Sequence, residues 1–273
     1  MADPYQPDFS APPSVPQMEL VWNDEFNKDG KPDAANWTYE KGFVRNEELQ
    51  WYKPENAWCK NGLLIIEGRS EKTANPNYKA GDKDWRRNRQ YAEYSSALLK
   101  SRGLQQWTFG RFEIRARIDT AMGSWPAIWT LGTGAAPWPS SGEIDLMEFY
   151  RINGTPTILA NVACGTDTQY KAKWFSQKIP FANFTAQDKD WHKKFHIWRM
   201  DWNEESIQLF IDDVLVNKTL LADAVNADGS TPFLQPQYLL LNLALGGNGG
   251  VPSIRNNPIT FEVDYVRVYQ KKQ

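Results

Sequence analysis

Three acidic side chains lie within six residues in the segment GEIDLMEFY, residues 142–150, whose other letters are typical of a β-strand. Side chains of a strand alternate between its two faces, so Glu143 and Asp145 point one way and Glu148 the other. A β-bulge between Asp145 and Glu148 adds one residue and restores the parity, and bulges are common beside active sites. The sequence therefore predicts three carboxyl groups on one face of a bulged strand.

Carboxyl groups in this arrangement suit the cleavage of a glycosidic bond. In the retaining form of that reaction, one carboxylate attacks the anomeric carbon and a second carboxyl group, about 5–5.5 Å away, protonates the leaving oxygen. Asp145 is expected to hydrogen-bond Glu143 and to raise the pKa of one member of the set by like-charge repulsion. The alternative is a solvated edge strand that merely carries negative charge, and the four apolar residues among the acids argue against it.

Several segments of the chain resemble one family. GEIDLME is similar to the active-site signature of glycoside hydrolase family 16, in the longer Glu-x-Asp-x-x-Glu form that contains the bulge. GSWPAIWTLG (residues 123–132), WNDEF, FEIRARI, NLALGGN and DYVRVYQ also resemble that family, so the similarity runs from Trp22 to Gln270. The resemblance implies a β-jelly roll in which Glu143 is the nucleophile, Glu148 the acid/base and Asp145 the supporting carboxylate.

Aromatic residues make up 14% of the chain, with 13 Trp. Sugars present flat apolar faces that stack on aromatic rings, although core packing is the alternative role for each ring. Trp125, Trp129 and Trp138 lie just before the acids and are candidates for substrate contact, and the resemblance places the first two in the family's substrate cleft. Asn46, in RNEELQWY, resembles a position that hydrogen-bonds substrate hydroxyls, and Asn242, in NLALGG, is interpreted in the same way.

The substrate implied by the resemblance is a β-glucan, and a groove open at both ends favours cleavage inside the polymer. Many laminarinases have a His followed by an aromatic residue where NVACG places Ala163 and Cys164. This departure favours mixed-linkage β-1,3/1,4-glucan over strict use of β-1,3-glucan (laminarin). The alternatives are an endo-acting galactanase similar to the agarases of the family, a transglycosylase, and a non-catalytic carbohydrate-binding jelly roll.

A structural calcium ion is implied by the resemblance alone. Many laminarinase-like members bind one on the convex side, through main-chain oxygens near the start of the chain and an aspartate in the last strand. The corresponding positions are Glu25, Gly62 and Asp264, and oxygen ligands suit this ion. The alternative is that Asp264 is an ordinary polar residue, and no cofactor is expected to take part in catalysis.

Short strands separated by turn signals indicate an all-β sandwich or barrel. We expect a jelly-roll sandwich of two antiparallel sheets with the acids and tryptophans on a concave face. Residues 110–118 alternate apolar and charged side chains, which predicts a half-buried strand. Asp212 and Asp213 predict a hairpin turn, and residues 220–225 show a weak helical pattern. Further strands are expected at 63–67, 95–99, 127–131, 157–162, 195–201, 206–211, 238–245 and 261–270.

The chain divides into a short leader and one large domain. Residues 1–17 are polar and rich in proline, which predicts an extended leader or linker that the fold does not need. Residues 18–273 are predicted to form a single catalytic domain, since no repeat or linker interrupts them.

Charge and hydropathy exclude several classes of partner. With 31 basic and 33 acidic residues the net charge is −2, so no basic surface indicates nucleic acid or an anionic membrane. No apolar run is long enough to span a bilayer. We expect a monomer acting on a neutral polysaccharide outside the producing cell, in the periplasm, on the surface or in the medium. Cys59 and Cys164 are consistent with either a disulfide or two buried thiols.

Overall fold

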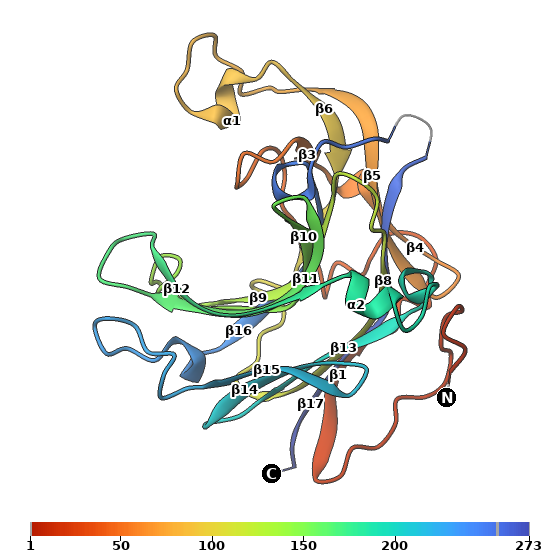
Figure 1. Ribbon diagram of the computed structural model, residues 1–273, viewed down its shortest axis with the longest axis vertical. Helices are drawn as coiled ribbons and strands as arrows, with labels where there is room; N and C mark the ends of the chain where they lie inside the picture. The colour runs from red at the N-terminus through yellow and green to blue at the C-terminus, as the bar shows by residue number, and fades with distance from the viewer. Residues whose placement is uncertain (1, 255–256, 273) are drawn as a thin grey trace.

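The structure, a computed structural model, describes residues 2–254 and 257–272. These residues form two β-sheets packed face to face (Figure 1). The larger sheet runs in the order β15-β14-β13-β8-β17-β5-β6-β3, with β1 added on β17 and β4 on β5. Its strands are β1 (Met18–Asp24), β3 (Gln50–Tyr52), β4 (Ala57–Lys60), β5 (Leu63–Ala74), β6 (Tyr91–Ser96), β8 (Gly110–Ile118), β13 (His196–Trp202), β14 (Ser206–Ile211), β15 (Val214–Leu220) and β17 (Ile259–Lys271).

The second sheet carries the predicted acids and runs in the order β12-β11-β10-β9-β16-β7-β2. Its strands are β2 (Thr38–Tyr39), β7 (Leu98–Lys100), β9 (Ser124–Gly132), β10 (Glu143–Ile152), β11 (Thr155–Gly165), β12 (Ala172–Pro180) and β16 (Gln237–Leu245). The helical segments are short: α1 (Trp85–Asn88), α2 (Ala182–Thr185), η1 (Pro54–Asn56), η2 (Trp191–Lys193), η3 (Pro232–Leu234) and η4 (Gly247–Gly249). Each of them belongs to a connection between strands.

Apolar side chains from the facing sides of the two sheets form the core. Phe112, Ile114 and Ala116 of β8 are fully buried, as their alternation predicted. On the opposite face of the same strand, Arg111 pairs with Asp201. The all-β jelly-roll sandwich predicted from the sequence is confirmed.

Strand β10 contains a β-bulge at the predicted place. Between Asp145 and Glu148, three steps along β10 face two steps along β11 and two along β9. Leu146 and Met147 inside the bulge are both buried in the core. Glu148 therefore returns to the face that Glu143 and Asp145 share, and all three line one cleft.

The turn prediction was right and the helix prediction was wrong. Asp212 and Asp213 join β14 to β15 with φ of 48° and 66°, the positive values that a tight hairpin needs. Strand β15 runs on to Leu220, and turns follow instead of a helix. Leu221 and Ala224 are buried, so their spacing reflects contact with the core. The other expected strands coincide with observed ones, except that 95–99 is divided between β6 and β7.

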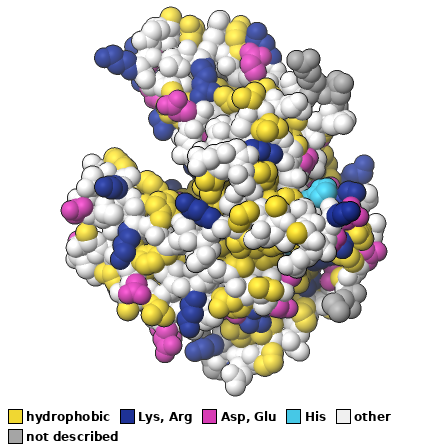
Figure 2. Space-filling view, in the orientation of Figure 1, with side chains coloured by type: hydrophobic (Ala, Val, Ile, Leu, Met, Phe, Trp, Pro, Cys, Tyr) yellow, Lys and Arg dark blue, Asp and Glu magenta, His cyan; other side chains and the backbone are white. Residues whose placement is uncertain are grey.

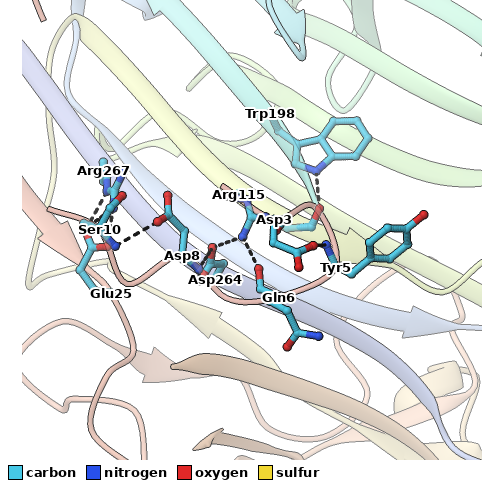
Figure 3. A network of polar contacts seen from close by, with 11 residues as sticks. Asp3, Tyr5, Gln6, Asp8, Ser10, Glu25, Arg115, Trp198, Asp264 and Arg267 are labelled. Atoms are coloured by element: carbon cyan, nitrogen blue, oxygen red, sulfur yellow. Dashed lines mark hydrogen bonds and ion pairs between the residues drawn. The ribbon is translucent and has the colours of Figure 1, made fainter. Parts of the chain in front are cut away.

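Residues 2–17 form no helix or strand, yet their first part lies along the outer face of the larger sheet (Figure 3). Arg115 of β8, which is 4% exposed, donates hydrogen bonds to the carbonyl oxygens of Asp3 (2.7 Å) and Gln6 (2.9 Å). The same guanidinium pairs with the buried carboxylate of Asp264 in β17. A buried cation therefore holds both the sheet and the leading segment.

Residues 8–10 continue this contact across the same face. The contacts are the N–H of Asp8 with the carboxylate of Asp264, the ring of Phe9 with Gly62, and the carbonyl oxygen of Ser10 with the guanidinium of Arg267. A Cβ atom at Gly62 would lie 2.6 Å from the Phe9 ring, so only glycine leaves room there. These contacts lead us to propose that the leading segment is part of the folded domain.

Deletion of residues 2–10 should lower the free energy of unfolding by about 2–4 kcal/mol, because buried Arg115 and Asp264 each lose hydrogen-bond partners. Urea denaturation of the full and shortened chains measures the difference. Gln6→Ala is the control and should change stability by less than about 0.5 kcal/mol, since Arg115 contacts the main-chain carbonyl. A shortened chain as stable as the full one would show that the segment is dispensable.

Candidate active site

The outward face of the second sheet is hollowed into a cleft of about 830 Å³. Figure 2 shows the molecule hollowed between the lobe that contains α1 and the sheet edge that contains β12. Side chains of β9, β10, β11, β12 and β16 line the cleft. The lining includes every predicted catalytic and substrate-contacting residue: Glu143, Asp145, Glu148, Trp125, Trp129, Trp138, Asn46 and Asn242.

Each of the two glutamates accepts a hydrogen bond from a tryptophan. The indole N–H of Trp125 donates to Glu148 Oε1 at 2.8 Å, and that of Trp138 donates to Glu143 Oε2 at 2.9 Å. Trp125 belongs to β9, whereas Trp138 lies in the loop between β9 and β10. These bonds fix the orientation of both carboxyl groups and favour their charged forms.

Asn161 of β11 completes the cluster and was not identified from the sequence. Its amide nitrogen donates to Asp145 Oδ2 at 3.0 Å and to Glu148 Oε2 at 3.4 Å. The hydrogen-bond partner of Asp145 is therefore Asn161, where the sequence analysis expected Glu143. Strand register held the missing signal, because Asn161 lies directly opposite Asp145 once β10 and β11 are paired.

Burial raises the pKa of all three acids, and neighbouring negative charges raise the pKa of Glu143 and Glu148 further. Burial raises the pKa of Asp145 to about 7, and burial together with the charge of Asp145 raises the pKa of Glu148 to about 8. Burial, followed by the charges of Asp145 and Glu148, raises the pKa of Glu143 well above its usual range. The cluster therefore retains protons near neutral pH, and a general acid needs one.

A hydrogen bond joins the side chains of Trp129 and Asn242 in the cleft. The indole N–H of Trp129 donates to Asn242 Oδ1 at 2.7 Å, and the amide nitrogen of Asn242 donates to the hydroxyl of Tyr52 at 3.3 Å. The guanidinium of Arg45 lies over the Trp129 ring, 5.2 Å from its centroid, and Trp129 is only 8% exposed. Asn242 thus orients Trp129 at the cleft floor, while direct substrate contact by either residue stays a prediction.

Asn46 lies at the cleft rim with a left-handed backbone, φ 55°. Its amide nitrogen donates to the buried carboxylate of Glu48 at 3.3 Å. The glycine-rich GGNGG segment also reaches the rim, where Gly247 lies against the ring of Trp125. Contact between Asn46 and a substrate hydroxyl stays a prediction.

At the positions predicted for calcium, arginine guanidinium groups engage the carboxylates of Asp264 and Glu25. Arg115 and the N–H of Asp8 engage the carboxylate of Asp264, and the leading segment covers Gly62. The carboxylate of Glu25 accepts two hydrogen bonds from Arg267, at 2.9 and 2.8 Å. Guanidinium groups thus supply the positive charge at these positions. Within residues 2–254 and 257–272, no group of three or more His, Cys, Asp or Glu side chains is arranged to hold a metal.

Neither the cysteines nor the histidine of β13 adds a reactive centre. Cys59 and Cys164 are buried and unpaired. The ring of His196 stacks on that of Trp191, with 3.7 Å between the ring centroids, and its Nδ1 hydrogen-bonds the carboxylate of Asp212. These contacts give His196 a packing role. In the described part of the chain, no helix has the length and apolar character that crossing a membrane requires.

A jelly roll whose cleft holds a row of three acids, each accepting a hydrogen bond, is the arrangement that a glycoside hydrolase requires. The sequence model of the family glycosyl hydrolases family 16 matches residues 67–267, and the chain belongs to that family. The β-glucanase of Rhodothermus marinus is 38% identical over 277 residues, which cover 94% of this chain and 86% of that protein.

Two solved structures show the same fold over nearly the whole chain. One comes from a study of endo-acting O-glycanases that members of the human gut microbiota express to initiate mucin breakdown. It has a TM-score of 0.85 and 34% identity, covering 96% of this chain and 94% of that chain. The other, a mutant of the non-specific endo-β-1,3(4)-glucanase SCLam, has a TM-score of 0.77 and 34% identity, covering 97% of this chain and all of that one.

Asp145→Asn should move the alkaline limb of the pH profile of kcat/KM to lower pH. The charge of Asp145 helps to raise the pKa of Glu148, so its removal makes the Glu148 proton easier to lose. The pKa of Glu148 should still lie above its ordinary value in this variant, because burial is the larger cause of its elevation. Glu48→Gln is the matched control and should move the limb less, since its charge is the weakest contribution to the same pKa. An unchanged limb in Asp145→Asn would contradict this coupling.

Proposed function

We propose that this glycoside hydrolase is a retaining endo-β-glucanase that cleaves mixed-linkage β-1,3/1,4-glucan and also β-1,3-glucan. The supporting observation is the bulge, which brings Glu143 and Glu148 to one face on either side of Asp145. The relatives reported above include a β-glucanase and an endo-β-1,3(4)-glucanase. A cleft that crosses the open face of a sheet suits attack within a polymer.

The reaction proceeds in two displacements. Glu148 gives its proton to the leaving glycosidic oxygen while a carboxylate oxygen of Glu143 bonds to the anomeric carbon, which forms a glycosyl-enzyme and releases the first sugar chain. Water then attacks the same carbon, Glu148 takes the proton from that water, and the bond to Glu143 breaks. Two inversions restore the starting configuration. The raised pKa of Glu148 keeps its proton available at neutral pH.

The roles of the other cleft residues follow from their contacts. The indole N–H of Trp138 opposes the raised pKa of Glu143 and so favours the carboxylate form that attacks, and Trp125 orients Glu148. Asp145, held by Asn161, modulates the protonation of Glu148. No group from outside the chain is required for these steps.

Preference for mixed linkages rests on the small residue beside the nucleophile. Ala163 lies directly opposite Glu143 on β11, where many laminarinases have a histidine. Ala163 is fully buried beneath the cleft face, and its methyl group takes up less space there than an imidazole would. A bend between β-1,3 and β-1,4 units is therefore easier to accommodate there.

A second candidate is endo-cleavage of mucin O-glycan chains. The observation that favours it is the TM-score of 0.85 with the structure from the O-glycanase study, against 0.77 for the endo-β-1,3(4)-glucanase. Agarase-like galactan cleavage is the other endo-acting alternative expected from the sequence. The two candidates share catalytic residues and differ in the sugars that the cleft accepts.

Product analysis separates the candidates. Barley mixed-linkage glucan, laminarin, agarose and gastric mucin O-glycans are incubated side by side, and the released sugars are sized and their linkages determined. Fast release of short oligosaccharides from barley glucan, with slower attack on laminarin, is expected. Cleavage of mucin glycans or agarose without cleavage of either glucan would establish the second candidate. Repeating the reaction with added acceptor sugar detects transglycosylation.

Glu143→Gln should lower kcat by at least roughly a thousandfold, because the amide cannot form the glycosyl-enzyme. Glu204→Gln, the same change at an exposed position outside the cleft, should leave kcat unaltered. Proton NMR of the first product should show the β-anomer before mutarotation. Release of the α-anomer would replace double displacement with a single inversion.

We also propose that the enzyme needs no calcium. Arg115 and Arg267 already neutralise the carboxylates of Asp264 and Glu25, so EDTA and millimolar calcium should leave both the melting temperature and the activity unchanged. A rise in melting temperature with calcium alone would show that the ion displaces the arginine pairs.

A location outside the producing cell and a monomeric state complete the proposal. A polysaccharide outside the cell meets only an enzyme that is also outside, so intact producing cells should degrade added glucan. Light scattering on the purified protein should give the mass of one chain.

A further inference from the structure

Strand β12, at the edge of the second sheet, presents a second row of side chains to the cleft. Every other residue of its central part faces the cavity, namely Trp174, Ser176 and Lys178. None of these three residues was predicted from the sequence, because residues 172–180 were not among the expected strands. The edge strand is therefore part of the substrate-facing surface.

The register places these residues in line with the acids. Trp174 pairs with Ala163, which in turn pairs with Glu143. Lys178 is aligned through β11 with Glu148 in the same way. Two interstrand spacings separate each member of β12 from its acid, or about 10 Å between main chains. That distance lies beyond the sugar under attack and within reach of another unit of the same substrate.

Exposure distinguishes Trp174 from most other cleft tryptophans. Trp125 and Trp129 are 6% and 8% exposed, whereas Trp138 and Trp174 are 37% and 45% exposed. Trp138 is bound to the nucleophile through its indole N–H. In the described residues the Trp174 indole has neither a hydrogen bond nor an aromatic partner, so its apolar face is open to the cleft. Large exposed aromatic groups in a cleft mark ligand contact.

The neighbours of Trp174 on β12 are suited to bind sugar hydroxyls. The ammonium of Lys178 carries three donors, and within the described residues it makes no ion pair or hydrogen bond. The hydroxyl of Ser176 both donates and accepts. An aromatic platform flanked by such groups matches a pyranose ring, which has an apolar face and a polar rim.

We propose that Trp174 is the stacking platform of an outer sugar subsite, with Ser176 and Lys178 binding the hydroxyls of the same glycosyl unit. The proposal deepens the proposed endo-glycosidase function and rests on it. The subsite contacts a unit that does not react, so it binds the ground state and the transition state equally. Its loss therefore raises KM and leaves kcat unchanged.

Trp174→Ala should raise KM for a polymer roughly tenfold, with kcat within about twofold of the parent. Trp174→Phe should recover most of the affinity, because it restores an aromatic face. Gln177→Ala is the matched control, since this exposed residue lies on the same strand and points to the other face, and it should change neither constant. Products of Trp174→Ala should also shift in length, because one binding unit no longer sets the register of the chain.

The kinetics are measured on whichever polymer among barley glucan, laminarin, agarose and mucin glycans the parent enzyme cleaves fastest. Cleavage of agarose or mucin glycans alone would overturn the glucan assignment and would still test Trp174. A KM for Trp174→Ala equal to that of the parent would overturn the subsite, whatever the polymer. Electrophoresis of Glu143→Gln, with and without Trp174→Ala, through gels containing each polymer provides a readout without hydrolysis. Equal retardation of the two proteins, or none for either, would also overturn the subsite.

Discussion

The desolvation of three carboxyl groups on one strand is the constraint around which the structure is organised. A bulge of one residue in β10 brings Glu143, Asp145 and Glu148 to the same face. Taking like charges out of water is unfavourable, and hydrogen bonds from two indoles and one amide offset only part of that cost. The remainder appears as raised pKa values, which give the site its protons. Packing in the rest of the sandwich offsets the loss of folding stability that such a cluster causes.

This arrangement links stability to pH in a definite direction. Each acid has a higher pKa in the folded chain than its ordinary value of 3.8 or 4.5. The folded state therefore binds more protons than the unfolded state between about pH 4 and pH 8, and the contribution of the three acids to stability falls as pH rises through that window. The proton that Glu148 gives to the leaving oxygen is one of the protons that relieve this repulsion. Activity near neutral pH thus requires a fold that tolerates partial ionisation of its own centre.

Much of the fold and the catalytic row could be predicted because their signals are local. Parity along residues 142–150 required the bulge, and alternation in residues 110–118 fixed a core strand. The enzyme class, also predicted, is confirmed by the family match. Other features depend on register between distant strands. Asn161 faces Asp145 only after β10 and β11 pair, and Trp174 enters the cleft only because β12 joins the sheet. Arg45 covers the ring of Trp129 across a large sequence separation, which no local pattern reveals.

The leading segment escaped prediction for a related reason, and that reason bears on how such chains diverge. Arg115 and Arg267 hold the carbonyl oxygens of residues 3, 6 and 10, and every amino acid carries that group. Substitutions in this stretch can therefore accumulate without loosening its attachment, as long as the backbone keeps its path and Gly62 stays small. The attachment depends instead on the two arginines and on their carboxylate partners Asp264 and Glu25. Leading segments of different sequence could therefore dock alike, provided that position 9 keeps a side chain that packs against Gly62.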